Sequence, residues 1–96
     1  MLVLVTYDVS TVTPAGRKRL NRVAKACKDY GVRAQKSIFE CEIDPAQWAH
    51  LKNKLLGIID ETEDSLRFYY LGSNWERKVE HHGANQPPDM NGLLLL

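Results

Sequence analysis

The sequence has few of the residues on which disulfide-bonded or zinc-stabilised small domains depend. Its 96 residues include only two cysteines, Cys27 and Cys41, which do not form a CxxC pair, and only three histidines. A disulfide framework or a zinc site therefore has little support. We expect a cytoplasmic protein that is held together by an ordinary hydrophobic core.

Long hydrophobic runs are also missing. Residues 1–5 are apolar, but they carry no basic leader, are too short to span a bilayer and run directly into Tyr7 and Asp8. We interpret this segment as a β-strand and expect no membrane contact. Hydrophobic residues make up 44% of the chain and charged residues 26%, which is typical of a globular domain and argues against a disordered chain.

The charge is distributed unevenly, although the net charge is only +1. Residues 1–36 hold eight basic against two acidic residues, a balance of +6, whereas the remainder holds five basic against ten acidic residues, a balance of −5. This asymmetry predicts one face that binds a polyanion and another face for different contacts.

The first half of the chain predicts a strand, a helix and two further strands. Residues 2–7 form an apolar, β-branched run typical of a central strand. The Thr13-Pro14 pair then provides an N-cap and a first helical residue, and an amphipathic helix with a basic outer face should end where Gly31 adopts the left-handed conformation. Within residues 32–43 the alternation shifts by one position, which predicts a bulge or tight reversal near residues 35–37.

The second half predicts a helix and one or two strands. Asp44, followed by Pro45 and Gln47, is typical of a capping box that begins a second helix. Residues 61–64 form an acidic segment that we expect to be a solvated connection, residues 65–71 form an aromatic-rich strand, and residues 75–79 could add a short fifth strand. The order β-α-β-β-α-β predicts an α+β, ferredoxin-like sandwich with both helices on one face of an antiparallel sheet.

The domain boundary is expected near residue 83. Residues 1–83 would form the ferredoxin-like domain, and residues 84–96 would form a C-terminal tail that ends in four leucines. The helix-free face of the sheet needs a cover, and so small a domain gains from association. We therefore expect a homodimer, with the tail either docked on the partner subunit or without fixed structure.

Asp8 is the first candidate functional residue, because a carboxylate at the end of an apolar strand is costly unless it is exposed or coordinated. One interpretation is that its side chain caps the following turn. The other interpretation is a magnesium site, although a single carboxylate provides few of the ligands that Mg²⁺ needs. A two-fold homodimer would bring two copies of Asp8 to a shared axis, where they could hold one divalent cation.

The candidate nucleic-acid-binding residues lie in the basic first third of the chain. Arg17 and Arg19 open the first helix, where the helix dipole also favours phosphate, although an exposed basic helix is often only a solvated face. Ser10, Arg33, Gln35, Ser37 and Phe39 are further candidates, and ordinary strand hydrogen bonding, with Phe39 in the core, would explain the last four equally well. His81 and His82 should point to opposite sides of a strand and are weak as a chelating pair.

Several segments, in this order, resemble the CRISPR-associated Cas-two family. They are residues 2–10 (LVLVTYDVS), 16–20 (GRKRL), 33–40 (RAQKSIFE) and 64–69 (DSLRFY). The resemblance covers residues 2–83. It implies a ferredoxin-like homodimer in which Asp8 binds magnesium or another divalent cation and has the catalytic role. It also implies that Arg17, Arg19, Arg33 and Phe39 are functional positions.

The resemblance further implies CRISPR adaptation, in which the protein binds duplex DNA or RNA and bridges integrase subunits of the Cas-one type. Members are also described as magnesium-dependent endonucleases that act on RNA or DNA. The sequence offers no evident general base beside Asp8, so we favour the bridging role over cleavage. The alternative is a non-catalytic RNA-binding module on a ferredoxin-like sheet, which would need exposed aromatic residues such as Tyr69 to stack on bases.

Overall fold

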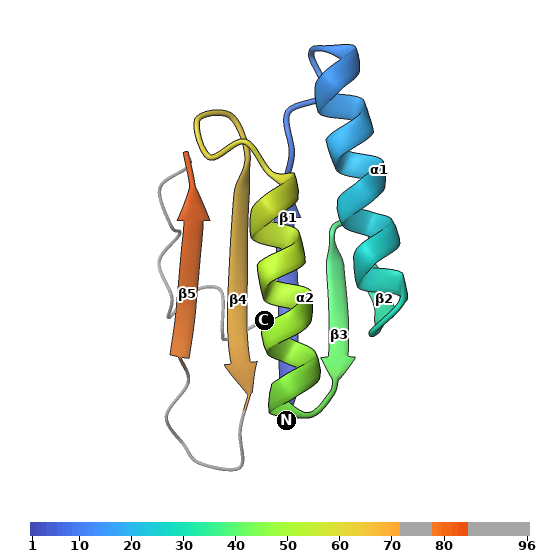
Figure 1. Cartoon of the computed structure of the whole chain (residues 1–96), viewed down its shortest axis with the longest axis vertical. Helices are drawn as coiled ribbons and strands as arrows, with labels where there is room; N and C mark the ends of the chain where they lie inside the picture. Colours follow the sequence, from blue (N-terminus) through green and yellow to red (C-terminus); the bar gives the residue numbers. More distant parts are fainter. Residues whose placement is uncertain (72–77, 85–96) are drawn as a thin grey trace.

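The described residues fold into one antiparallel sheet with two helices packed on the same face (Figure 1). The computed structural model describes residues 1–71 and 78–84. Within them the elements are β1 (Leu2–Asp8), α1 (Pro14–Lys28), β2 (Val32–Gln35), β3 (Ile38–Glu42), α2 (Pro45–Ile58), β4 (Ser65–Leu71) and β5 (Lys78–Gly83). The strands follow the order β2-β3-β1-β4-β5, and each neighbouring pair is antiparallel. The α+β, ferredoxin-like prediction is confirmed.

Both helices begin at the caps that the sequence predicts. The Thr13 hydroxyl accepts a hydrogen bond from the Gly16 amide at 3.1 Å, and Pro14 is the first residue of α1. At α2, the Asp44 carboxylate accepts from the Gln47 amide at 2.7 Å while the Gln47 side chain accepts from the Asp44 amide at 3.1 Å. These reciprocal bonds use donors that a helix leaves free in its first turn, so they fix where each helix starts.

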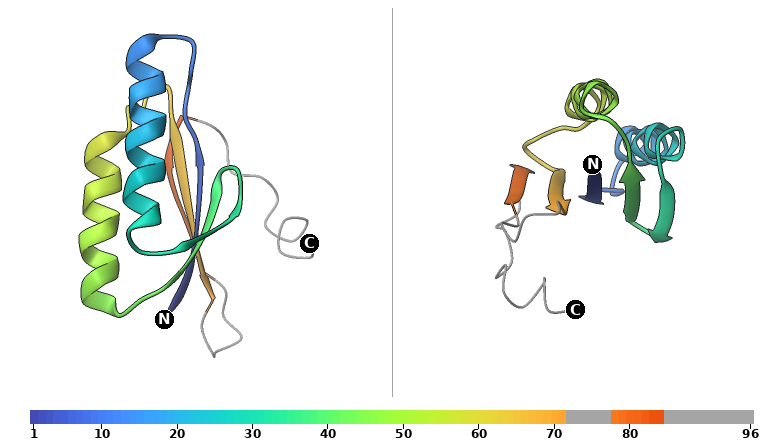
Figure 2. Two further views of the ribbon diagram at one scale, coloured as in Figure 1. Left: turned by 90° about the vertical axis from the view of Figure 1, so that its right-hand side faces the viewer. Right: turned by 90° about the horizontal axis from the view of Figure 1, so that it is seen from below.

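The core lies between the helices and the sheet, and neither of the two described helices lies on the other sheet face (Figure 2). Val3, Val5 and Tyr7 alternate with less buried residues along β1, as expected for a strand with one face against the core. Leu51 and Leu55 of α2 are completely buried. The remaining fully buried large side chains come from every layer: Val23, Cys27, Phe39, Cys41, Asp64, Leu66 and Phe68.

The strand pair after α1 has the predicted reversal. β2 and β3 form a hairpin across residues 36 and 37, with a register shift between Arg33 and Gln35. This irregularity is the structural origin of the one-position shift in the hydrophobic alternation.

The expected conformation of Gly31 is wrong. Among the described residues only Gly83 has a positive φ, 120°, and α1 instead ends through the amides of Tyr30 and Gly31, which both donate to the Cys27 carbonyl. Glycine is needed at position 31 for space, since a Cβ atom there would lie 2.5 Å from the Glu40 carbonyl oxygen and 2.6 Å from the Cys41 Sγ atom.

Two other predictions need correction at the end of the domain. The fifth strand expected at residues 75–79 is confirmed in part, but it continues further: β5 spans Lys78–Gly83, and residues 75–77 lie outside the described residues. Residues 61–64 are a connection as predicted, but Asp64 is completely buried and not solvated. Nearly all of the tail, from residue 85 on, also lies outside the described residues, so its docking stays a prediction. In the part of the chain that the structure describes, neither helix has the length and apolar character needed to cross a membrane.

Candidate nucleic-acid interface and metal site

Asp8 is exposed at the end of the central strand, directly opposite Ser65 of β4. Asp8 therefore faces solvent at one end of the sheet, as a cation ligand requires. Across residues 1–71 and 78–84, no group of three or more histidine, cysteine or acidic side chains could hold a metal ion. Asp8 is therefore not part of a three-ligand group within the described residues, and it fits a magnesium ion only where further ligands are supplied.

The loop that follows Asp8 is held by a buried acid. The Asp64 carboxylate, 0% exposed, accepts hydrogen bonds from the Ser10 amide at 3.0 Å, the Asp60 amide at 2.9 Å and Arg19 Nε at 2.7 Å. Burial alone would raise the pKa of Asp64, but these hydrogen bonds bring it below its ordinary value. Asp64 is therefore an ionised residue that joins the β1–α1 loop, α1 and the end of α2.

Arg19 is consequently turned toward the protein. Its Nη2 atom lies 3.2 Å from Glu63 in addition to the bond from Nε to Asp64, and its side chain is 15% exposed. The Asp64 hydrogen bond is the main reason that the pKa of Arg19 is raised. The predicted role of Arg19 in nucleic-acid binding stays a prediction, whereas its ion pair with Asp64 is a feature of the fold.

The β2–β3 turn lies at the same end of the sheet as Asp8. The Tyr7 amide donates to the Ser37 carbonyl at 3.1 Å, and the Tyr7 hydroxyl donates to the Lys36 carbonyl at 3.2 Å. Burial raises the pKa of Tyr7 and outweighs the opposite effect of the nearby Arg33 charge. The structure thus places Ser37 beside the end of β1. Ser10 lies two residues after Asp8, and its amide is bound by Asp64, which precedes β4.

Arg33 and Phe39 lie on neighbouring strands and interact directly. The Arg33 guanidinium carbon is 5.1 Å from the centroid of the Phe39 ring. Arg33 and Gln35 are exposed, and Phe39 is 0% exposed. The Phe39 ring is therefore part of the core and makes a cation–π contact with Arg33. Its predicted role in nucleic-acid binding stays a prediction.

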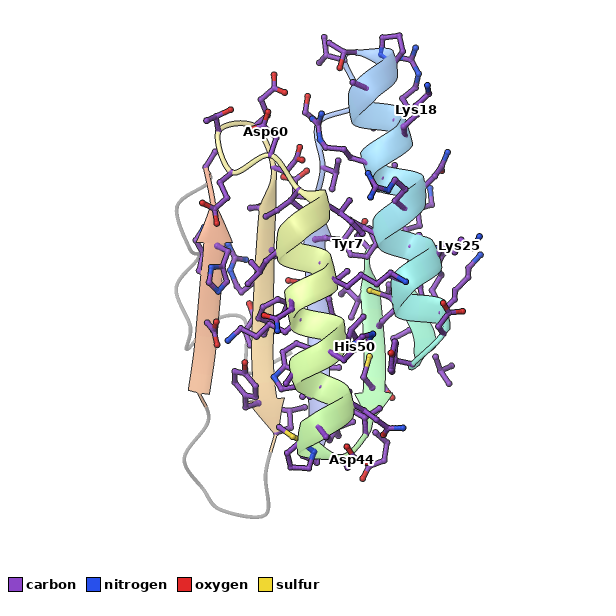
Figure 3. The ribbon with its side chains drawn as sticks, viewed as in Figure 1. Tyr7, Lys18, Lys25, Asp44, His50 and Asp60 are labelled. Carbon is purple, nitrogen blue, oxygen red and sulfur yellow. The ribbon has the colours of Figure 1, made fainter. Side chains whose placement is uncertain are left out.

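The outer side of α1 carries a continuous set of exposed cations. Lys18, Arg22 and Lys25 recur three to four residues apart and share one side of the helix. Figure 3 shows Lys18 and Lys25 pointing away from α2. We call these residues, together with the exposed cations next to them in the chain, the basic edge: Arg17, Lys18, Arg22, Lys25, Lys28, Arg33 and Lys36.

The basic edge is available to an external anion. None of the ion pairs between described residues involves one of its members. Arg17 also donates from Nη1 to the Thr11 carbonyl at 3.1 Å, which attaches it to the β1–α1 loop. The structure therefore keeps seven positive charges exposed along α1 and β2.

A second polar cluster links β5 to α2. Glu80 accepts a hydrogen bond from the Tyr70 hydroxyl at 2.8 Å and pairs with Lys52 at 2.5 Å and His82 at 2.6 Å. Burial opposes ionisation of Glu80, yet these three partners lower its pKa to about 2. The ring of His82 also packs against Phe68. His81 faces the opposite side of β5, so the two histidines do not chelate together.

Sequence reasoning missed Asp64 and Glu80. Asp64 directly precedes the buried strand β4, as Asp8 directly ends β1, and that position next to an apolar run was a usable signal. Glu80 lies in a segment without clear hydrophobic alternation. Its partners Lys52 and Tyr70 come from two other elements, so no local pattern marks it.

The described residues define a small ferredoxin-like α+β protein with two helices on one face of an antiparallel sheet. The sheet has an exposed acid at the end of its central strand and a basic edge beside it. The chain belongs to the Cas2 family, because residues 1–79 match the family described as CRISPR associated protein Cas2.

Similar proteins share the full length of the chain. A "CRISPR-associated endoribonuclease Cas2" of Chlorobaculum tepidum is 62% identical over 96 residues and is covered completely, as is this chain. A "CRISPR-associated endonuclease Cas2" of Halalkalibacterium halodurans is 53% identical, with 99% of each chain covered. Among solved structures, Streptococcus pyogenes Cas2 at pH 6.5 superposes with a TM-score of 0.70 and 63% identity, covering 78% of this chain and 90% of that one.

Proposed function

We propose that this protein acts in CRISPR spacer acquisition as a homodimer that binds duplex nucleic acid and bridges integrase subunits of the Cas-one type. The observation that carries the proposal is the basic edge, which presents exposed cations of α1 and β2 without intrachain ion pairs among the described residues. Family membership supports the CRISPR context.

The chemistry of the basic edge favours a phosphate backbone over base edges. Lysine and arginine side chains that follow one helix side bind a line of phosphates and release counterions, so affinity depends steeply on salt. Nothing in the basic edge forms a pattern that reads base identity. We therefore expect binding to duplexes of many sequences.

The binding test compares two matched variants by fluorescence anisotropy with a labelled DNA duplex across a NaCl series. The variant Lys18→Gln/Arg22→Gln/Lys25→Gln should weaken binding and reduce the slope of log K against log [salt] by about 2 to 3. The control Lys54→Gln removes an exposed charge from α2 and should change both quantities little. Equal binding by the triple variant and the wild type would refute the role of the basic edge.

The bridging role needs a separate experiment. Co-purification with the Cas-one-type integrase encoded in the same locus should recover a complex that contains two copies of this chain. Folded, dimeric protein that fails to co-purify with folded integrase would contradict the bridging role without affecting duplex binding.

A metal-dependent nuclease is a second candidate, favoured by the exposed Asp8 and by the endonuclease names of the relatives. The donor set fits a divalent cation only if a second chain contributes its own Asp8, since the described residues of one chain offer no three-ligand group. Such an ion would activate a water molecule for phosphodiester hydrolysis. The basic edge would hold the nucleic acid beside it.

The cleavage test uses labelled RNA and duplex DNA with and without Mg²⁺. Asp8→Asn should abolish metal-dependent cutting. The control Glu42→Gln changes an exposed acid that lies opposite Leu2, at the other end of β1, and should cut like the wild type. Equal cutting by Asp8→Asn and the wild type would indicate contamination and would remove the nuclease candidate.

The RNA-binding alternative loses its principal support. Tyr69 is on the helix-free side of β4 but only 3% exposed, so its ring is not available to stack on bases.

A further inference from the structure

Asp64 is completely buried and is held by hydrogen bonds from three other residues. A completely buried carboxylate is costly unless its oxygens are fully hydrogen-bonded. Here Oδ1 accepts from the Ser10 amide at 3.0 Å and from Arg19 Nη2 at 3.4 Å, and Oδ2 accepts from Arg19 Nε at 2.7 Å and the Asp60 amide at 2.9 Å. Donors on two sides fix the plane and position of the carboxylate.

Asp64 is attached to Asp8 through the backbone on both sides. Its neighbour Ser65 is the direct cross-strand partner of Asp8, and its Oδ1 atom holds the amide of Ser10, two residues after Asp8. A displacement of Asp64 would therefore move the strand opposite Asp8 and the loop that follows it together.

The first turn of α1 packs against this loop and restricts its backbone conformation further. A Cβ atom at Gly16 would collide with the Ser10 carbonyl oxygen, so helix and loop are in close contact. The Ser10 amide is held by Asp64, and its carbonyl faces Gly16. The backbone next to Asp8 thus has little freedom to shift.

We propose that Asp64, with Arg19 as its counter-ion, is a positioning residue for the Asp8 site. This inference rests on the proposed role of Asp8 in binding a divalent cation. Asp64 itself contacts neither metal nor nucleic acid; it holds the Ser10 loop and Ser65 so that the Asp8 carboxylate keeps one position. Arg19 acts through Asp64, and its charge is used inside the protein.

The proposal separates two explanations of Arg19. If Arg19 bound phosphate, its loss would weaken nucleic-acid binding and reduce the salt dependence. If it positions Asp8 through Asp64, its loss should weaken metal binding and lower kcat, while KM for the nucleic acid and the salt slope stay nearly unchanged.

The variants are Asp64→Asn, Arg19→Gln and the conservative Arg19→Lys, with Glu63→Gln as the control. An amide at position 64 retains one acceptor oxygen. It must therefore give up either the bonds from the Ser10 amide and Arg19 Nη2 or the bonds from Arg19 Nε and the Asp60 amide. Glu63 contacts the same arginine from an exposed position, with its side chain 49% exposed. The full-length dimer is used throughout, and circular dichroism checks that each variant is folded.

Metal binding is measured with Mn²⁺ alone by electron paramagnetic resonance. Asp64→Asn and Arg19→Gln should each weaken Mn²⁺ affinity by about tenfold or more. The double variant should bind Mn²⁺ no more weakly than the more severe single variant. Arg19→Lys should bind Mn²⁺ more tightly than Arg19→Gln. Glu63→Gln should match the wild type. Unchanged Mn²⁺ affinity in Asp64→Asn would overturn the proposal.

Amide hydrogen exchange and NMR chemical shifts test the positioning of Asp8 without any metal. In the wild type the Ser10 amide should be protected, and Asp64→Asn or Arg19→Gln should reduce this protection and shift the Asp8 signals. If the wild type binds no Mn²⁺, or Asp8→Asn binds it equally well, the proposed metal site fails while the Asp8 shifts still test positioning. Unmoved Asp8 signals in both variants would refute the inference whatever the metal result.

Discussion

Gly31 is required where the connection between α1 and β2 passes close to β3, and this leads to a stability prediction. Gly31→Ala should destabilise the protein by about 1–3 kcal/mol, because its new Cβ would lie 2.5 Å from the Glu40 carbonyl oxygen. Gly57→Ala is the matched control: no atom lies within 4 Å of its added Cβ, and it sits in α2, so it should be neutral or stabilise by up to about 1 kcal/mol. Urea unfolding of both variants at one protein concentration measures the difference. A Gly31→Ala protein as stable as the wild type would contradict the tight contact.

The candidate site residues could be predicted only partly from the sequence. Asp8 stood out because an acid at the end of an apolar run is exceptional. Asp64 was hidden in an acidic run that resembles a solvated loop, and its burial depends on Arg19, which lies 45 residues away. Phe39 looked like a candidate contact but is buried. Alternation along a strand cannot decide which face of the strand is buried until the neighbouring strands are placed.

At the scale of elements, the helices were more predictable than the last strand. Caps act within three residues, as in Thr13 with Gly16 or Asp44 with Gln47, so sequence patterns contain them. The position of β5 depends on pairing with β4 and on Glu80, which is held by Lys52 of α2. Such distant contacts leave no local pattern, which is why the expected strand ended at residue 79, whereas β5 continues to Gly83.

The attachment of β5 to α2 should weaken in acid. Since the pKa of Glu80 falls from 4.5 to about 2 in the folded protein, its stabilising contribution is complete above about pH 4.5 and is lost as the pH falls toward 2. Glu80→Gln should therefore be less stable than the wild type at pH 7, and the gap should narrow by pH 3. Urea unfolding at both pH values measures it. A gap that stays constant, as expected for the exposed control Glu42→Gln, would show that the ionised Glu80 does not stabilise β5.

At the scale of the whole molecule, the fold class followed from the order of elements, whereas the assembly did not. The periodicity of one chain cannot reveal a two-fold partner. The partner was inferred because both helices of a ferredoxin-like fold cover one sheet face and the other face needs a cover. Leu2, Leu4 and Ile38 lie on that face and are half-buried, in alternation with the core residues of β1 and β3. These side chains are the physical basis for expecting a homodimer.

Dimerisation is tested by a charge placed on the helix-free face. The wild type should sediment as a dimer, and Leu4→Glu should shift it toward monomer while the circular dichroism spectrum is retained. Val12→Glu places the same charge at a position that is 86% exposed in the β1–α1 loop and should leave the dimer intact. A wild type that stays monomeric at high concentration would exclude the shared Asp8 site.

The basic edge lies along β2 and α1 at one side of the sheet, whereas Glu80 in β5, the last strand at the other side, is paired with Lys52 and His82. Unpaired positive charge is therefore concentrated at one side of the described part of the molecule, and its electric field is strongest beside α1. A nearby polyanion would exert a torque on the protein before any contact forms and would turn α1 toward itself. Encounters would thus be oriented from the start, and their rate would drop as added salt shortens the reach of the field.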